Sequence, residues 1–134
     1  LATAAATAAG LWWCRRLPAL RRLQVWQAQL VSGWTTADAV SVALLSGLAE
    51  EALMRAVLQP LIGLLAAAGL FALLHIVPDR DLWLWPVFAL VLGLGFGMLF
   101  ERYGFPAAAI AHAGLNLMAI QQLRGIGGDV GEPA

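Results

Sequence analysis

Six polar side chains in three groups carry the chemistry that this sequence offers. A carboxylate and an imidazole are the groups that most often take a proton from a reacting water in a protein site. An imidazole and a side-chain amide can together donate hydrogen bonds to a developing oxyanion. The sequence therefore holds the groups needed for proton transfer and for oxyanion stabilisation. The six residues are Glu50, Glu51, Arg55, His75, His112 and Asn116.

The first group is a pair of adjacent glutamates followed by an arginine. Glu51 and Arg55 are four residues apart, so on a helix they share one face and can form an ion pair, which is more often structural than chemical. Glu50 is turned about 100° away from Glu51 and has no such partner on its own helix. We therefore predict that Glu50 is the general base or proton shuttle, and that it needs a partner on another helix.

The other groups each have a structural alternative. His112 and Asn116 are four apart and share one helix face, where they would either stabilise an oxyanion or join two helices by hydrogen bonds. His75 lies near the end of its apolar segment, a common place for an interfacial histidine. Gly47 lies one turn before the glutamates and would let another helix or a peptide approach closely.

A metal centre is a second possibility for the same residues. One carboxylate and two imidazoles, from Glu50, His75 and His112, could form a three-ligand zinc site with an open position. The sequence has no H-E-x-x-H motif, so the metalloprotease arrangement on a single helix is absent. Water activation with a divalent metal and without one both stay open, and we prefer the metal-free form.

The composition indicates a membrane protein. Hydrophobic residues make up 61% of the chain and charged residues only 12%, with no lysine, whereas a soluble domain carries about 25% charged residues. The net charge is zero, which excludes a basic surface for nucleic acid. The single cysteine, Cys14, excludes an internal disulfide.

Four apolar segments approach the length of about 20 residues that a helix needs to cross a membrane. Residues 14–35 are expected to form a helix on the membrane surface, with a connecting loop as the alternative. Residues 1–13 would be the remnant of a fifth span. We predict an all-α, polytopic bundle of four to five membrane helices with one interfacial helix. The four spans are 37–59, 61–77, 82–100 and 105–123.

The chain is expected to form a single domain over residues 1–134, with its core at 37–124. It begins with Leu1, which indicates a piece of a longer protein. Gly93 and Gly97 do not fit a dinucleotide-binding loop, because residue 98 is methionine, and are predicted to form a helix-packing face.

The arginines predict the orientation of the bundle, because cytoplasmic loops collect positive charge. With residues 14–35 inside, six loop arginines fall on the cytoplasmic side and only Arg102 falls outside. A lysine-free chain rich in alanine and arginine favours a bacterium with a GC-rich genome, so we expect a multi-pass protein of the bacterial inner membrane. The six are Arg15, Arg16, Arg21, Arg22, Arg80 and Arg124.

The three groups in this order resemble the CPBP family of intramembrane proteases. This family includes CAAX prenyl proteases and bacteriocin-processing enzymes and is also called the Abi or Rce1-like family. The resemblance covers about residues 45–120. The chain departs from the frequent F-R-G that follows the two glutamates, and the linker to the second motif is short. The motifs are E-E-x-x-x-R (Glu50, Glu51, Arg55), F-x-x-x-H (Phe71, His75) and H-x-x-x-N (His112, Asn116).

The resemblance implies hydrolysis of peptide bonds at or within the membrane. Glu50 and His75 would activate a water, and His112 and Asn116 would hold the oxyanion. Glu51 and Arg55 would support Glu50. The expected partners are membrane lipid and a substrate with a prenylated C-terminus or a leader-like peptide; the oligomeric state stays open. The alternative is a non-catalytic member of the family that acts as an immunity protein, a scaffold or a partner of a transporter.

Overall fold

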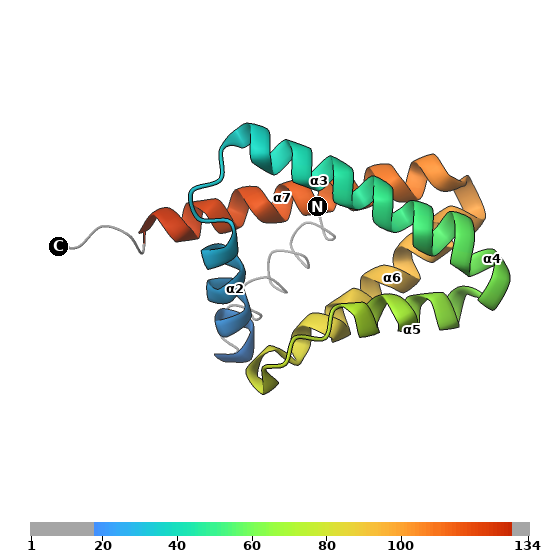
Figure 1. The fold of residues 1–134 in the computed structure, drawn as a ribbon, viewed down its shortest axis with the longest axis horizontal. Helices are drawn as coiled ribbons and strands as arrows, with labels where there is room; N and C mark the ends of the chain where they lie inside the picture. Colours follow the sequence, from blue (N-terminus) through green and yellow to red (C-terminus); the bar gives the residue numbers. More distant parts are fainter. Residues whose placement is uncertain (1–17, 130–134) are drawn as a thin grey trace, which may run out of the picture.

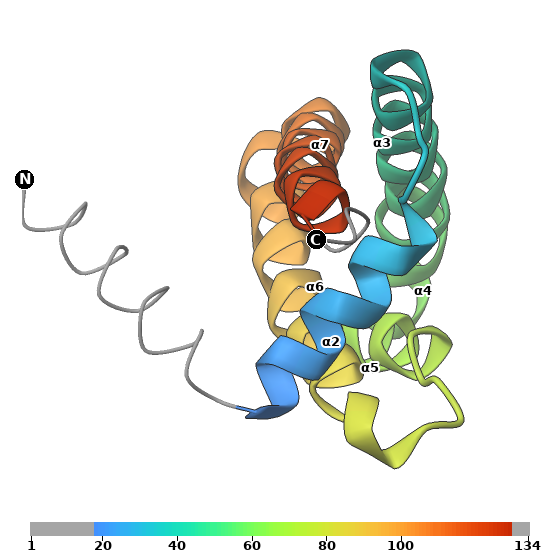
Figure 2. The same ribbon diagram turned by 90° about the vertical axis from the view of Figure 1, so that its left-hand side faces the viewer.

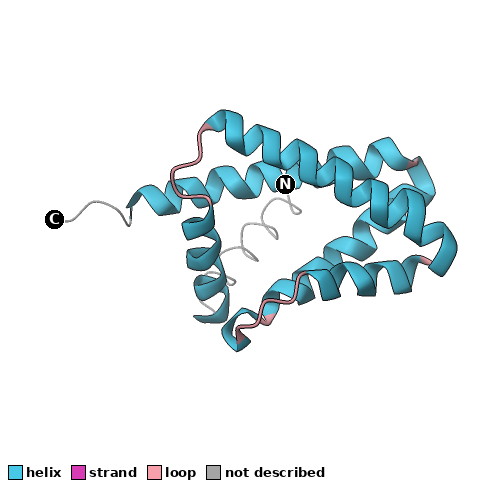
Figure 3. Cartoon of the chain, viewed as in Figure 1, coloured by secondary structure: helices cyan, strands magenta, loops and turns pink. Residues whose placement is uncertain are grey.

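The computed structural model describes residues 18–129 and the side chains of residues 18–125. The predicted all-α class is confirmed, since every regular element in this part of the chain is a helix (Figure 3). The predicted remnant at 1–13, together with Cys14, Arg15 and Arg16, lies outside the described residues. The elements are α2 (Pro18–Leu30), α3 (Thr36–Glu51), the π-helix η1 (Ala52–Leu58), α4 (Gln59–Ile62), α5 (Leu64–Leu74), the 3-10 helix η2 (Arg80–Leu82), α6 (Leu84–Tyr103) and α7 (Phe105–Asp129).

Two pairs of adjacent helices make up the bundle. α3 packs beside α7, α5 packs beside α6, and α6 also contacts α7 (Figure 1). Gly63 and Gly104 have φ values of 82° and 80°, a conformation that glycine adopts without steric cost, and they allow the sharp turns that begin α5 and α7. The long α3–η1–α4 stretch and α7 therefore face the α5–α6 pair.

Helix α2 crosses one end of this bundle. In Figures 1 and 2 it runs from the loop between α5 and α6 to the start of α3, near the end of α7. An exposed ion pair between Arg22 and Asp81 joins α2 to the α5–α6 connection. The helix predicted within residues 14–35 is thus confirmed over 18–30, and the alternative of a connecting loop is excluded for these residues.

The predicted spans differ from the helices in length. The first span is one continuous helical stretch, 36–62, and α6 and α7 extend beyond their predicted ends. α5 has only 11 residues, because His75 ends it and Pro78 follows. Among the described residues, one helical segment, Arg80–Tyr103, is long and apolar enough to cross a membrane by length and composition.

Close helix contacts depend on glycines in the way the sequence predicted. A Cβ atom at Gly47 would lie 2.7 Å from the backbone nitrogen of Ala113, so α3 and α7 touch backbone to backbone. A Cβ atom at Gly93 would lie 3.2 Å from Phe71 of α5, and one at Gly97 would lie 2.2 Å from Leu64. The predicted packing face of Gly93 and Gly97 is confirmed.

Replacing Gly47 by alanine tests the α3–α7 contact. The added methyl group overlaps rigid backbone, so the helices must separate, and we expect a loss of about 1–3 kcal/mol in the free energy of unfolding. Thermal unfolding in detergent measures this change. Gly114→Ala on α7 is the matched control, because no atom lies within 4 Å of its added Cβ. Equal melting temperatures for the two variants would contradict the contact.

Candidate active site

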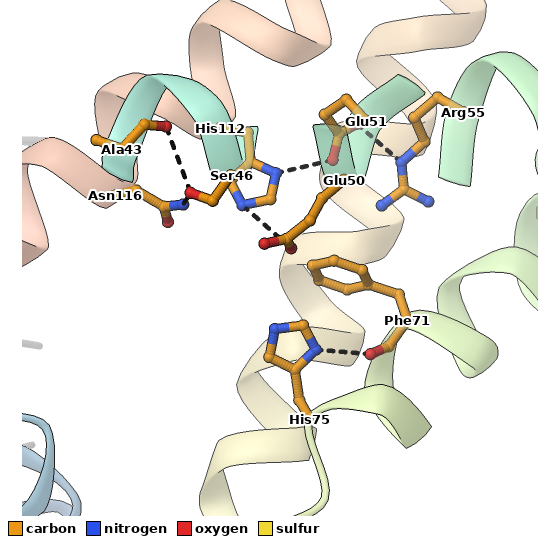
Figure 4. Close-up of polar contacts among 9 residues, drawn as sticks. All are labelled: Ala43, Ser46, Glu50, Glu51, Arg55, Phe71, His75, His112 and Asn116. Atoms are coloured by element: carbon orange, nitrogen blue, oxygen red, sulfur yellow. Dashed lines mark hydrogen bonds and ion pairs between the residues drawn. The ribbon is translucent and has the colours of Figure 1, made fainter. Parts of the chain in front are cut away.

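The six predicted residues come from the continuous α3–η1 stretch, from α5 and from α7, which meet inside the bundle. Glu50 and Glu51 lie at the end of α3, directly before the π-helix that carries Arg55. His75 caps the end of α5. The two remaining residues, His112 and Asn116, lie on α7 and face α3 (Figure 4).

Glu51 is the centre of a buried cluster. Arg55 Nε donates a hydrogen bond to Glu51 Oε2 at 2.9 Å, and both side chains are fully buried. His112 Nδ1 lies 2.9 Å from Glu51 Oε1. The predicted Glu51–Arg55 ion pair is confirmed, and His112 joins it.

This contact decides where His112 carries its hydrogen. The Glu51 carboxylate is paired with Arg55 and only accepts, so Nδ1 of His112 must be the donor. A neutral ring then has a lone pair at Nε2, whereas a protonated ring donates from both nitrogens. Phe96 stacks on the imidazole with ring centroids 4.6 Å apart, and Phe71 meets it edge-on at 5.9 Å. The ring is therefore held in one orientation.

Glu50 points away from Glu51, as predicted, and stays partly exposed, with 37% of its side chain accessible. Its Oε2 lies 3.9 Å from Nε2 of His112. Within the described chain no hydrogen bond or ion pair joins Glu50 to His75, which was the predicted partner. The neighbouring ring is His112, because the backbone contact of Gly47 with Ala113 brings the preceding residue of α7 against the glutamates.

His75 is oriented by its own helix. Its Nδ1 lies 2.7 Å from the carbonyl oxygen of Phe71, which only accepts, so Nδ1 is the donor and Nε2 of the neutral ring keeps its lone pair. The ring lies 4.5 Å from the Phe71 ring and 5.4 Å from the Trp85 ring, measured between centroids. In Figure 4 the Glu50 carboxylate points to the side of the site on which His75 lies.

Ser46 is a site residue that the motif analysis missed. Asn116 Nδ2 donates to Ser46 Oγ at 2.9 Å, and Ser46 Oγ donates to the carbonyl oxygen of Ala43 at 3.4 Å. Ser46 precedes Glu50 by four residues, so this spacing was the available signal. The bond holds the Asn116 amide beside α3 and leaves its second N–H uncommitted.

The residues do not form the metal site that the sequence allowed. Between residues 18 and 125, no three histidine, cysteine, aspartate or glutamate side chains come together in a way that could hold a metal ion. Glu50 and His112 approach each other, but no hydrogen bond or ion pair among the described residues joins His75 to either of them. In this structure the three side chains are therefore not gathered as a Glu50–His75–His112 zinc centre would require.

Comparison with known protein families agrees with the motifs. Residues 32–118 match the model of the type II CAAX prenyl endopeptidase Rce1-like family. The match covers more than half of the chain and all six predicted site residues, so the chain belongs to this family. Its members are membrane proteases that act on prenylated proteins. No curated protein and no solved structure matches the chain significantly.

Glutamine substitutions at the two adjacent glutamates should reduce the stability of the protein to very different extents. Glu51→Gln leaves the buried Arg55 without its counter-charge, so we expect a loss of about 3–5 kcal/mol in the free energy of unfolding. Glu50→Gln changes a partly exposed group and should cost less than about 1 kcal/mol. Chemical or thermal unfolding of the purified proteins compares the two. The cluster described above would be wrong if Glu50→Gln were the more destabilising change.

Proposed function

We propose that the chain is an intramembrane endopeptidase that hydrolyses peptide bonds in membrane-associated substrates, of the CAAX type or leader-like. The observation that carries this proposal is the convergence of three helices on one site. A partly exposed carboxylate from α3, an imidazole with an available Nε2 from α5 and hydrogen-bond donors from α7 lie in it. Membership in a protease family supports the same chemistry.

In the proposed mechanism, Glu50 and His75 activate the attacking water. Glu50 is free to accept a proton because Glu51, not Glu50, pairs with Arg55. His75 is a hydrogen-bond acceptor at Nε2, because its Nδ1 is committed to Phe71. The water oxygen attacks the scissile carbonyl carbon while one of its protons passes to this pair, which gives a tetrahedral intermediate. The C–N bond then breaks as that proton is delivered to the leaving amine, and the carbonyl re-forms as a carboxylic acid.

His112 and Asn116 would stabilise the negative charge on the carbonyl oxygen. Because Glu51 fixes the Nδ1 hydrogen of His112, Nε2 donates to the oxyanion only when the ring carries a second proton. Asn116 contributes its second N–H, since Ser46 binds the first. Glu51 and Arg55 act as positioning residues for this ring.

A multi-pass placement in the membrane completes the proposal. Large apolar side chains are exposed on several helices, among them Leu44 on α3, Leu65 on α5, Val91 on α6 and Ile110 on α7. Such a surface is stable against lipid and unfavourable in water. The arginines Arg21, Arg22 and Arg80 gather at the end covered by α2, which we assign to the cytoplasmic side of a bacterial inner membrane.

Loss of the general base tests the mechanism directly. We expect Glu50→Gln and His75→Ala each to lower kcat by about 10²–10⁴-fold, the usual contribution of a positioned acid or base. The assay follows cleavage of a prenylated peptide and of an unprenylated membrane peptide by purified protein in detergent, with and without chelator. Asp81→Asn, on the exposed connection before α6, is the control. Cleavage that persists in Glu50→Gln would refute the mechanism.

The oxyanion assignment makes a separate prediction. Asn116→Ala should lower kcat by about 10²–10³-fold with little change in KM, because the lost hydrogen bond acts mainly in the transition state. Ser46→Ala should give a smaller loss of kcat, since the amide is then less well held. An effect of Asn116→Ala on KM alone would assign this residue to substrate binding instead.

A further inference from the structure

Three buried polar atoms near the active site have no hydrogen-bond partner among the described residues. They are Nη1 and Nη2 of Arg55 and Oε1 of Gln59. Arg55 is fully buried and Gln59 is 4% exposed. Leaving charged donors and an amide acceptor unpaired in a protein interior is strongly unfavourable.

The orientation of the Gln59 amide is determined by its other contacts. Its Nε2 lies 3.1 Å from the carbonyl oxygen of Gly97 and 3.0 Å from Glu101 Oε1, and both of these atoms only accept. The nitrogen must therefore face α6, and Oε1 is the free acceptor. Glycine at position 97 is required for this arrangement, because a Cβ there would lie 2.7 Å from Oε1.

Arg55 and Gln59 lie on the same buried stripe as Glu51. Residues four apart on an α-helix drift by about 40° around its axis, but η1 is closed by wider i→i+5 turns, such as the bond from Gln59 N to Met54 O. The π-helix turns less per residue, so it offsets this rotation and keeps the three side chains on one side of the helical stretch. All three side chains stay buried.

We propose that a water molecule bound between Arg55 and Gln59 completes a buried polar chain, and that Gln59 is a positioning residue for the active site. The water accepts from Arg55 Nη and donates to Gln59 Oε1, which matches the two to four polar partners of buried waters. The chain then runs from Glu101 at the end of α6, through Gln59, the water and Arg55, to Glu51 and His112. The positioning role depends on the proposed protease activity, whereas the water site does not.

An experimental structure that resolves ordered waters tests the site without any assay. We expect density at hydrogen-bonding distance, about 2.7–3.2 Å, from both Arg55 Nη and Gln59 Oε1. A structure with no density between these atoms would overturn the proposal.

Cleavage kinetics test the positioning role. Gln59→Met keeps the length of the side chain but removes its donor and acceptor, and we expect kcat to fall about 10-fold with KM unchanged, because a small misplacement of catalytic groups has effects of this order. Gln122→Met, on the exposed surface of α7, is the matched control.

Unchanged kcat in Gln59→Met, or a change in KM alone, would refute the positioning role. If the wild-type protein cleaves nothing, the proposed function and the positioning role fail together, while the density still decides the water site.

Discussion

The buried carboxylate of Glu51 is the group on which the site depends. It is held by Arg55 on its own helical stretch and by His112 from α7, so one side chain ties a local ion pair to a contact between helices. A buried carboxylate or guanidinium without a partner is strongly destabilising. Glu51 and Arg55 therefore depend on each other, and His112 satisfies the remaining oxygen of Glu51. The ordering of the site is therefore inseparable from the packing of α3 on α7.

The sequence was sufficient for the features that depend on local spacing. The Glu51–Arg55 pair follows from two residues four apart, and the turn of Glu50 away from Glu51 follows from helix geometry. The all-helical class and the packing role of Gly93 and Gly97 followed from apolar segments and small residues. These predictions required no knowledge of which helices are neighbours.

The features that were missed depend on the register between helices. The approach of Glu50 to His112 was not predicted, because the contact of Gly47 with Ala113 determines the position of α7 along α3. The bond from Asn116 to Ser46 has the same origin. The π-helix was also missed, because such segments are rare and no spacing of residues in 52–58 distinguishes one from an α-helix.

The shortness of α5 has a consequence for hydrolysis inside a membrane. Eleven helical residues extend about 16 Å, roughly half of the ~30 Å hydrocarbon layer. In the proposed membrane placement, the polar connection that contains Asp79, Arg80 and Asp81 lies on the cytoplasmic side, and His75 comes only four residues before it. An enzyme that consumes water needs a hydrated path to its reacting atoms, and a short helix that ends close to these charged residues keeps that path short.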